Sequence, residues 1–163
     1  MRKTIAWTTH LPILIKLVNE TDGPILELGS GIFSTPYLHW ACYADKRELV
    51  SYDNQSQFID LMQQYRTDYH RIEAVEDYAY ADIDRYWDIA FVDHDPAERR
   101  GIDAQRLLHF AKYVVVHDSD PKTQGIYGYD QAFAQAKYRW DFTETRPNTT
   151  VLSNYIDLKD FKL

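Results

Sequence analysis

The chain has 163 residues with 45% hydrophobic residues, which suits one domain, 1–163, built on one core. No apolar run is long enough to span a bilayer, and Met1 to Trp7 lack the apolar core of a signal peptide. The single cysteine, Cys42, excludes an internal disulfide and a cysteine-based zinc site, and it fits a reducing cytoplasm. The formal net charge of −7 disfavours broad binding to nucleic acid, because an acidic surface repels phosphates. We therefore expect a cytoplasmic protein without a membrane partner.

Apolar residues at helical spacing predict a first helix from about Thr9 to Glu20, which Asp22-Gly23-Pro24 ends. Strands and helices then alternate. In chain order we expect a strand over 25–28, a helix over 34–44 with Ser34 as its cap, a strand over 48–52, a helix around Phe58 to Tyr65, strands over 70–75 and 87–92, a helix over 103–111, a strand over 113–116 and a helix over 129–136.

Two closing strands, 140–145 and 149–154, are joined by a turn at Pro147-Asn148 and predict a hairpin. The alternation before them predicts an α/β fold, a parallel sheet with helices on both faces. Ligands of such sheets bind beyond the carboxyl ends of the strands. Acidic residues gather at these ends: Glu27, Asp53, Glu76-Asp77, Asp93-His94-Asp95 and His117-Asp118-Ser119-Asp120. Unpaired, they would repel one another, so we expect a bound cation or a hydrogen-bonding ligand there.

The first strand runs into a glycine turn, Ile25-Leu26-Glu27-Leu28-Gly29-Ser30-Gly31. Glycines allow a tight turn and close approach of a ligand. The dinucleotide fingerprint would place a third glycine where Ser34 stands. Glu27, one residue before the turn, would repel a diphosphate but suits an ammonium or a sulfonium group. The turn therefore favours a cationic ligand.

This turn, a second strand ending at Asp53 and the closing hairpin together resemble the class I S-adenosylmethionine-dependent methyltransferases, from about residue 9 to 154. The resemblance implies a Rossmann-like three-layer sandwich, with a mostly parallel seven-stranded sheet and a C-terminal antiparallel hairpin, and an N-terminal helix within 1–22 that covers the site. It implies that Asp53 accepts hydrogen bonds from both ribose hydroxyls and that Asp93 lies beside the sulfonium. The implied cofactor-binding residues are Glu27, Gly29, Ser30, Gly31, Asp53, Asn54, Asp77, Tyr78 and Asp93.

The stretch from Trp87 to His94 is similar to the corresponding strand of catechol-type small-molecule O-methyltransferases, in which two acids and an asparagine hold a magnesium ion. Asp93 and Asp118 match the two acids. Ser119 stands in place of the asparagine, and Asp95 stands near the place of a lysine base. The resemblance therefore implies Mg²⁺ on Asp93 and Asp118, with Asp120 as a substitute for the missing ligand. The role of the base then passes to His94 or His117, or the metal alone lowers the pKa of the substrate. The catalytic candidates are Asp93, His94, His117 and Asp118.

The implied function is S-adenosylmethionine-dependent methylation of a hydroxyl or phenol on a small molecule, with an RNA or protein acceptor left open. A nicotinamide-dependent oxidoreductase is an alternative that Asp53 would also fit, although Ser34, Glu27 and the hairpin count against it. A cofactor-binding module without catalysis is a second alternative.

Two loops bear on the acceptor. Arg99 and Arg100 either grip an anionic acceptor or form surface ion pairs. The tyrosines of 125–129 either wall a substrate loop or serve a subunit interface, and a homodimer would complete the pocket.

Overall fold

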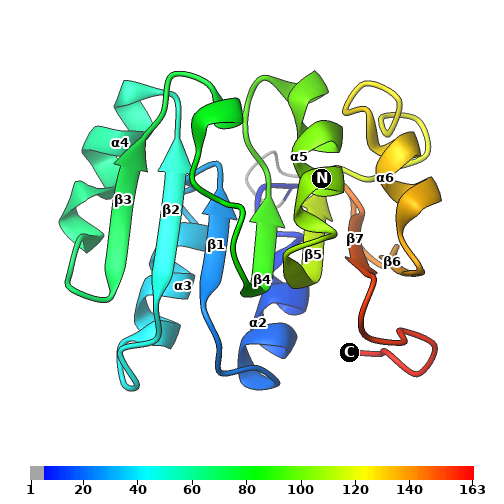
Figure 1. Ribbon diagram of the computed structural model, residues 1–163, viewed down its shortest axis with the longest axis horizontal. Coiled ribbons are helices and arrows are strands. Elements are labelled where there is room, and N and C mark those ends of the chain that lie inside the picture. Colours follow the sequence, from blue (N-terminus) through cyan, green and yellow to red (C-terminus); the bar gives the residue numbers. More distant parts are fainter. Residues whose placement is uncertain (1–5) are drawn as a thin grey trace.

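The computed structural model describes residues 6–163, and its strands form one seven-stranded sheet in the order β3-β2-β1-β4-β5-β7-β6 (Figure 1). The first five strands pair in parallel, and β7 runs antiparallel to both β5 and β6. This confirms the predicted sheet with its closing hairpin. The strands are β1 (Ile25–Leu28), β2 (Leu49–Asp53), β3 (His70–Ala74), β4 (Trp87–Val92), β5 (Ala111–His117), β6 (Tyr138–Phe142) and β7 (Thr149–Ser153).

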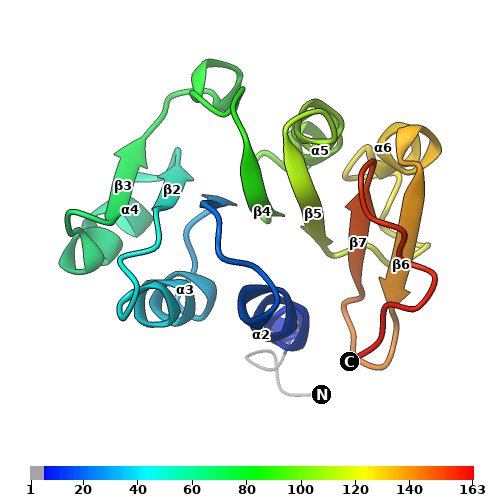
Figure 2. The same ribbon diagram turned by 60° about the horizontal axis from the view of Figure 1, so that its bottom comes forward.

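Helices cover both faces of the sheet, as the alternation of strands and helices predicts. Figure 2 shows α2 and α3 on one face and α5 and α6 on the other. The helices are α2 (Leu11–Asn19), α3 (Ser34–Cys42), α4 (Ser56–Met62), α5 (Arg100–Leu107) and α6 (Tyr129–Gln135), with short 3₁₀ turns η1 (Gln63–Tyr65), η2 (Tyr78–Tyr80) and η3 (Ala97–Arg99).

Two apolar clusters hold these three layers together, one on each face of the sheet. Side chains alternate between the faces along a strand. Leu26 and Leu28 of β1 accordingly pack with Leu107 of α5, whereas Ile25 packs with Leu14 of α2. All four residues of β1 are buried, as expected for a central strand covered on both faces. The rigid centre of the sheet thus fixes where the turn after β1 lies.

The structure differs from the sequence predictions mainly at the ends of elements. The helix expected over 103–111 begins at Arg100 and ends at Leu107, and β5 begins at Ala111, which pairs with Trp87. The first strand of the hairpin begins and ends earlier than expected, at Tyr138–Phe142, whereas the second begins at Thr149 as expected and ends one residue early, at Ser153. Ser34 does not cap α3, whose N-cap is Phe33 without a side-chain hydrogen bond. These positions depend on tertiary contacts that local patterns do not contain.

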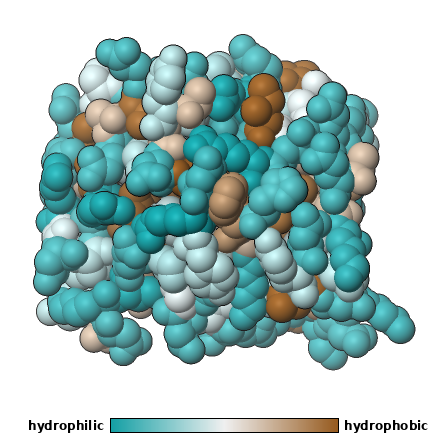
Figure 3. All heavy atoms as spheres, in the orientation of Figure 1, coloured by the Kyte–Doolittle hydropathy of each residue, from teal (hydrophilic) through white to brown (hydrophobic). Residues whose placement is uncertain are grey.

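The face of the molecule shown in Figure 3 is mainly hydrophilic, with hydrophobic side chains scattered among the polar ones. That distribution agrees with the formal charge of −7. In the part of the chain that the structure describes, no helix combines the length and apolar character needed to cross a bilayer.

Candidate functional site

A pocket of about 400 Å³ lies at the carboxyl ends of the central strands, a volume in the range of small-molecule sites. The glycine turn 29–34 and Asp53 line one part of it. The other part, which we call the acceptor end, is lined by Trp7, His10, Arg100, His117, Asp118 and Pro147. Strands β1 and β4 are neighbours in the sheet, although they are not consecutive in sequence, so the pocket sits where the strand order reverses. Residues 1–5 of the expected N-terminal cover lie outside the described residues.

The turn after β1 requires glycine at position 29. Gly29 has φ +95°, a conformation that residues with a side chain rarely adopt. A Cβ atom there would lie 2.7 Å from the backbone of Asp93 and from Cα of His94. The turn therefore rests directly on the end of β4, which brings its amide groups next to the acids of that strand end.

Glu27 braces this turn from below and is not among the residues that line the pocket. Its Oε2 accepts hydrogen bonds from the hydroxyls of Thr35 (2.8 Å) and Ser51 (2.5 Å). Thr35 Oγ1 in turn accepts one from the amide of Gly31 (2.9 Å). The carboxyl group is fully buried, and this burial raises its pKa to about 7. Glu27 therefore shapes the turn through Thr35.

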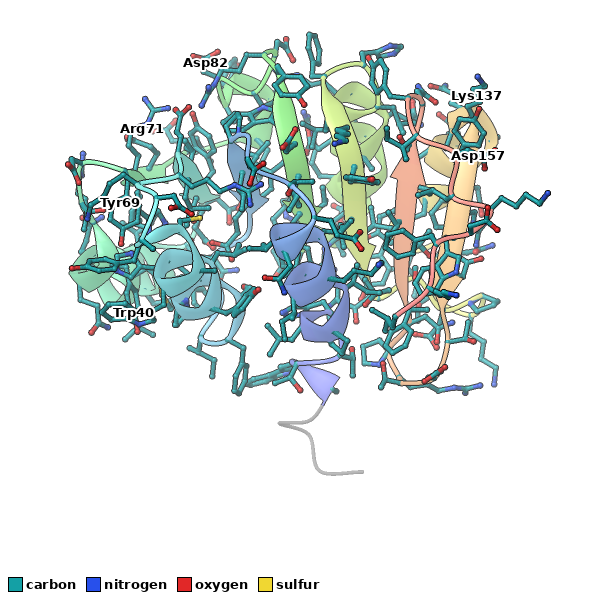
Figure 4. All side chains as sticks on the ribbon, turned by 90° about the horizontal axis from the view of Figure 1, so that it is seen from below. Trp40, Tyr69, Arg71, Asp82, Lys137 and Asp157 are labelled. Carbon is teal, nitrogen blue, oxygen red and sulfur yellow. The ribbon has the colours of Figure 1, made fainter. Side chains whose placement is uncertain are left out.

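The hydrogen bonds continue from Ser51 through a buried chain of polar side chains. Ser51 Oγ lies 3.0 Å from His70 Nε2, and His70 Nδ1 lies 3.2 Å from His39 Nδ1. Tyr69, which Figure 4 labels beside α3, places its hydroxyl 3.1 Å from His39 Nε2. Burial lowers the pKa of His70 to about 3, so its imidazole is neutral near pH 7. Glu27 thus belongs to a polar network that reaches from the turn to α3.

Asp53 links the two loops that border the first part of the pocket. Its Oδ2 accepts a hydrogen bond from the amide of Ser30 (2.7 Å), and its Oδ1 accepts one from the amide of Gln55 (2.8 Å). Burial raises its pKa, although the backbone donors oppose that effect. Each carboxylate oxygen can accept a second hydrogen bond. The pair of oxygens therefore suits a vicinal diol entering the pocket.

Arg100 supplies the positive charge that the strand-end acids need. Its guanidinium NH1 lies 2.9 Å from Asp93 Oδ1 and 3.0 Å from Asp118 Oδ2, and its other nitrogens donate to the carbonyls of His94 and Asp93. Burial alone would raise the pKa of Asp93, but His117 and Arg100 lower it to about 2. Arg100 is buried, so it is neither a surface residue nor free to grip an acceptor.

This arrangement does not fit the Mg²⁺ ion expected between Asp93 and Asp118. A guanidinium group already bridges the two carboxylates. Ser119, which stands where a third ligand was expected, holds its hydroxyl 2.8 Å from that of Thr150. Magnesium prefers several oxygen ligands, whereas here the two carboxylates share the Arg100 cation. The residues present thus satisfy the acids without that metal.

Two imidazoles border the acceptor end. His117 Nδ1 lies 3.2 Å from Asp93 Oδ1, and its Nε2 lies 2.9 Å from Thr9 Oγ1. Burial lowers the pKa of His117, but Asp93 outweighs that effect and the net shift is upward. His10 packs on Phe91, and its ring centroid is 4.8 Å from that of His117. Burial, together with His117, lowers the pKa of His10 to about 3.

His94 takes a position that does not suit direct proton transfer to or from an acceptor. Its side chain is fully buried, and its Nε2 lies 3.1 Å from Asp103 Oδ2. Its ring stacks on Tyr78, with the centroids 3.9 Å apart. Asp103 also pairs with Arg99. His94 thus borders the pocket together with Asp93, but its ring nitrogen Nε2 is directed to Asp103 of α5.

Three other expected cofactor residues, Asn54, Asp77 and Tyr78, are not among the residues that line the pocket. Asp77 caps η2 by accepting a hydrogen bond from the amide of Ala79, and Tyr78 is buried beneath His94. Gln55 and Phe58 line the pocket instead. Neither residue is predicted from the sequence, because Phe58 fits the apolar face of a helix and Gln55 carries no motif.

The tyrosines of the 125–129 segment support the rim from outside the pocket. Tyr127 donates a hydrogen bond to Asp118 Oδ2 (3.2 Å), and Tyr129 donates one to the carbonyl of His117 (2.8 Å). The segment packs tightly on α5, because a Cβ atom on Gly101 would lie 2.0 Å from the carbonyl oxygen of Gly128. These contacts hold the rim in place and do not form the expected aromatic walls of a substrate loop.

No protein-family model matches the sequence, and no curated protein matches it. Solved structures do match. A Klebsiella pneumoniae protein provisionally assigned as an O-methyltransferase superposes with a TM-score of 0.65 at 12% identity, over 96% of this chain and 81% of that one. An O-methyltransferase from Bacillus cereus, in complex with S-adenosylhomocysteine, superposes with a TM-score of 0.62 at 14% identity, over 93% of this chain and 80% of that one. The methyltransferase domain of METTL16 superposes with a TM-score of 0.61 at 9% identity, over 96% of this chain and 70% of that one. The chain therefore has the Rossmann-like fold of these S-adenosylmethionine-dependent methyltransferases, as its sequence resemblance implied.

Proposed function

We propose that the chain is an S-adenosylmethionine-dependent methyltransferase that methylates a hydroxyl or phenol oxygen of a small molecule. The observation that carries the proposal is the pairing of a glycine turn with Asp53 at the mouth of the sheet. Asp53 is bonded to the amide of Ser30 and keeps acceptor capacity on both oxygens for the ribose of the cofactor. The solved methyltransferases share the fold on which these residues lie.

The acceptor end supports transfer to an oxygen atom. Methyl transfer is a displacement at a carbon that the sulfonium already activates, so the protein mainly aligns the acceptor and helps its proton to leave. Asp93 and His117 form a hydrogen-bonded pair that lines this end of the pocket, and we assign to them the removal of that proton. Asp118 helps by holding Arg100 in place. His94 has no direct part, and it acts as a support beneath Asp93.

A small acceptor suits the residues that line this end of the pocket. Trp7 and Pro147 line it, and the net charge of −7 disfavours a nucleic acid there. The test is transfer of tritium from methyl-labelled S-adenosylmethionine to a panel of phenols, catechols, aliphatic alcohols, amines and RNA. We expect label on a hydroxyl-bearing small molecule, and Asp53→Ala should abolish the transfer. Transfer to RNA or to an amine alone would contradict the proposed acceptor.

A further inference from the structure

Two buried imidazoles and a carboxylate meet at the acceptor end of the pocket. They are His10 at the N-cap of α2, Asp93 after β4 and His117 at the end of β5. One ligand atom from each lies within 4.8 Å of the other two. The residues are far apart in the sequence and come together only in the fold. We propose that these three residues bind a divalent transition metal ion such as Zn²⁺. Its use in methyl transfer would rest on the proposed function, but its binding would not.

His10 is the first observation that points to a ligand. The residue is 2% exposed, and neither ring nitrogen has a hydrogen-bond partner among the described residues. Buried polar groups in folded proteins are nearly always satisfied, so an unpartnered imidazole calls for an explanation such as an ion. The ring lines the pocket beside that of His117, at a centroid distance of 4.8 Å. Its free nitrogens can therefore turn toward a shared ion.

The contacts of His117 are compatible with a metal ligand. Its Nε2 lies 2.9 Å from Thr9 Oγ1, which also lies 3.3 Å from the carbonyl of Ala6. Its Nδ1 lies 3.2 Å from Asp93 Oδ1. When Thr9 donates its hydroxyl hydrogen to Ala6, His117 donates through Nε2–H and the lone pair of Nδ1 faces Asp93, so that an ion can take the place of a proton between the two groups.

The chemistry of the donors selects the kind of metal. Imidazole nitrogens suit zinc and other transition metals, whereas magnesium prefers oxygen ligands. A second protein group that fixes the other nitrogen of a histidine ligand is typical of metal sites, and Thr9 does this for His117. Arg100 and His117 both contact Oδ1 of Asp93, so an ion beside His117 would share this carboxylate with Arg100.

The geometry needs one adjustment. Ligand atoms bound to one zinc ion lie about 3.4 Å apart, given bonds of about 2.1 Å in tetrahedral directions. The His117–Asp93 distance of 3.2 Å is already close to that value. His10 has to close the remaining gap by turning its ring, which no hydrogen bond to a described residue restrains. Three protein ligands would leave one position open toward the pocket, where an acceptor hydroxyl would lose its proton more readily.

The test is metal binding by the full chain, purified without a histidine tag and without cofactor. Calorimetry with Zn²⁺, and visible absorption on titration with Co²⁺, should show one ion per chain. We expect His10→Ala and His117→Ala to weaken binding at least about 100-fold, and Thr9→Val to weaken it at least about 10-fold. His109→Ala is the matched control, because His109 is an exposed histidine outside the cluster, and it should bind like the unchanged chain. Millimolar Mg²⁺ should not displace Co²⁺.

Two results would overturn the proposal: no saturable binding of Zn²⁺ or Co²⁺ by the folded chain, or unchanged affinity in His10→Ala. Circular dichroism of each variant shows whether it is folded. If His117→Ala does not fold, His10→Ala and Thr9→Val decide the question. Binding is measured without methyl donor, so absence of methyl transfer leaves a positive metal result intact. A folded chain that transfers the methyl group but binds neither Zn²⁺ nor Co²⁺ would overturn this inference and leave the proposed function standing.

Discussion

Replacing Glu27 by glutamine should make the chain more stable at high pH and leave it nearly unchanged at low pH. Burial raises the pKa of Glu27 from 4.5 to about 7. Between these values the folded chain holds a proton that the unfolded chain has released, so stability falls as pH rises. A difference of about 2.5 units, at about 1.4 kcal/mol per unit, corresponds to about 3 kcal/mol lost above pH 7. Glutamine cannot ionise, and it keeps an oxygen that can accept from Thr35 and Ser51.

The assay is urea unfolding of both proteins, followed by circular dichroism at several pH values from 4 to 8.5. Subtracting the free energy of unfolding of one protein from that of the other removes the contributions of the ionisable groups that both proteins contain. The difference between Glu27→Gln and the unchanged chain should be flat below pH 4.5, rise between pH 4.5 and 7, and level off near 3 kcal/mol in favour of the variant. A difference that does not depend on pH would mean that Glu27 ionises as in water, and it would refute the buried network beneath the glycine turn.

Two further substitutions test the turn and the rim. Gly29→Ala places a Cβ atom 2.7 Å from the backbone at the end of β4, so it should lower the free energy of unfolding by about 1–3 kcal/mol and weaken cofactor binding. Gly125→Ala is the control, because a Cβ atom there meets nothing within 4 Å, and it should change neither quantity. Arg100→Met removes the cation that bridges Asp93 and Asp118 and leaves them only His117 and Tyr127 as partners, so it should lower the free energy of unfolding by about 2 kcal/mol, against less than about 0.5 for the exposed Arg71→Met. Mg²⁺ should raise the melting temperature of Arg100→Met but not that of the unchanged chain. Equal stability of the two arginine variants would show that the bridge does not hold the rim.

The fold class and the place of the site could be predicted because they follow from local patterns, whereas the seven-stranded sheet was implied by the family resemblance. Alternating strands and helices specify a parallel sheet, and the glycine turn with Asp53 marks its ligand-binding edge. Predictions of cofactor contacts were less reliable for residues that are only sequence neighbours of a motif residue. Asp53 lines the pocket and Asn54 does not, because consecutive residues at a strand end face opposite ways.

The electrostatics of the rim could not be predicted from the sequence. Arg100 was read as a loop residue, yet it begins α5 and reaches across to two strand ends. Nothing in the spacing of charged residues shows which cation will enter a cluster of acids. His10 is expected in a first helix that covers the site, and as a weaker catalytic candidate than His94 and His117, but only the packing of α2 against β4 and β5 brings it beside His117.

Calorimetric titration with S-adenosylmethionine and S-adenosylhomocysteine tests the central claim most directly, with NAD as the competing ligand and Asp53→Asn as the variant. We predict saturable binding of both sulfur compounds at one site per chain, no binding of NAD, and at least about a 100-fold loss of affinity in Asp53→Asn, since two hydrogen bonds to a charged group are weakened. Folded protein that gives no saturable heat with either sulfur compound, or that binds NAD in their place, would contradict the assignment of this pocket.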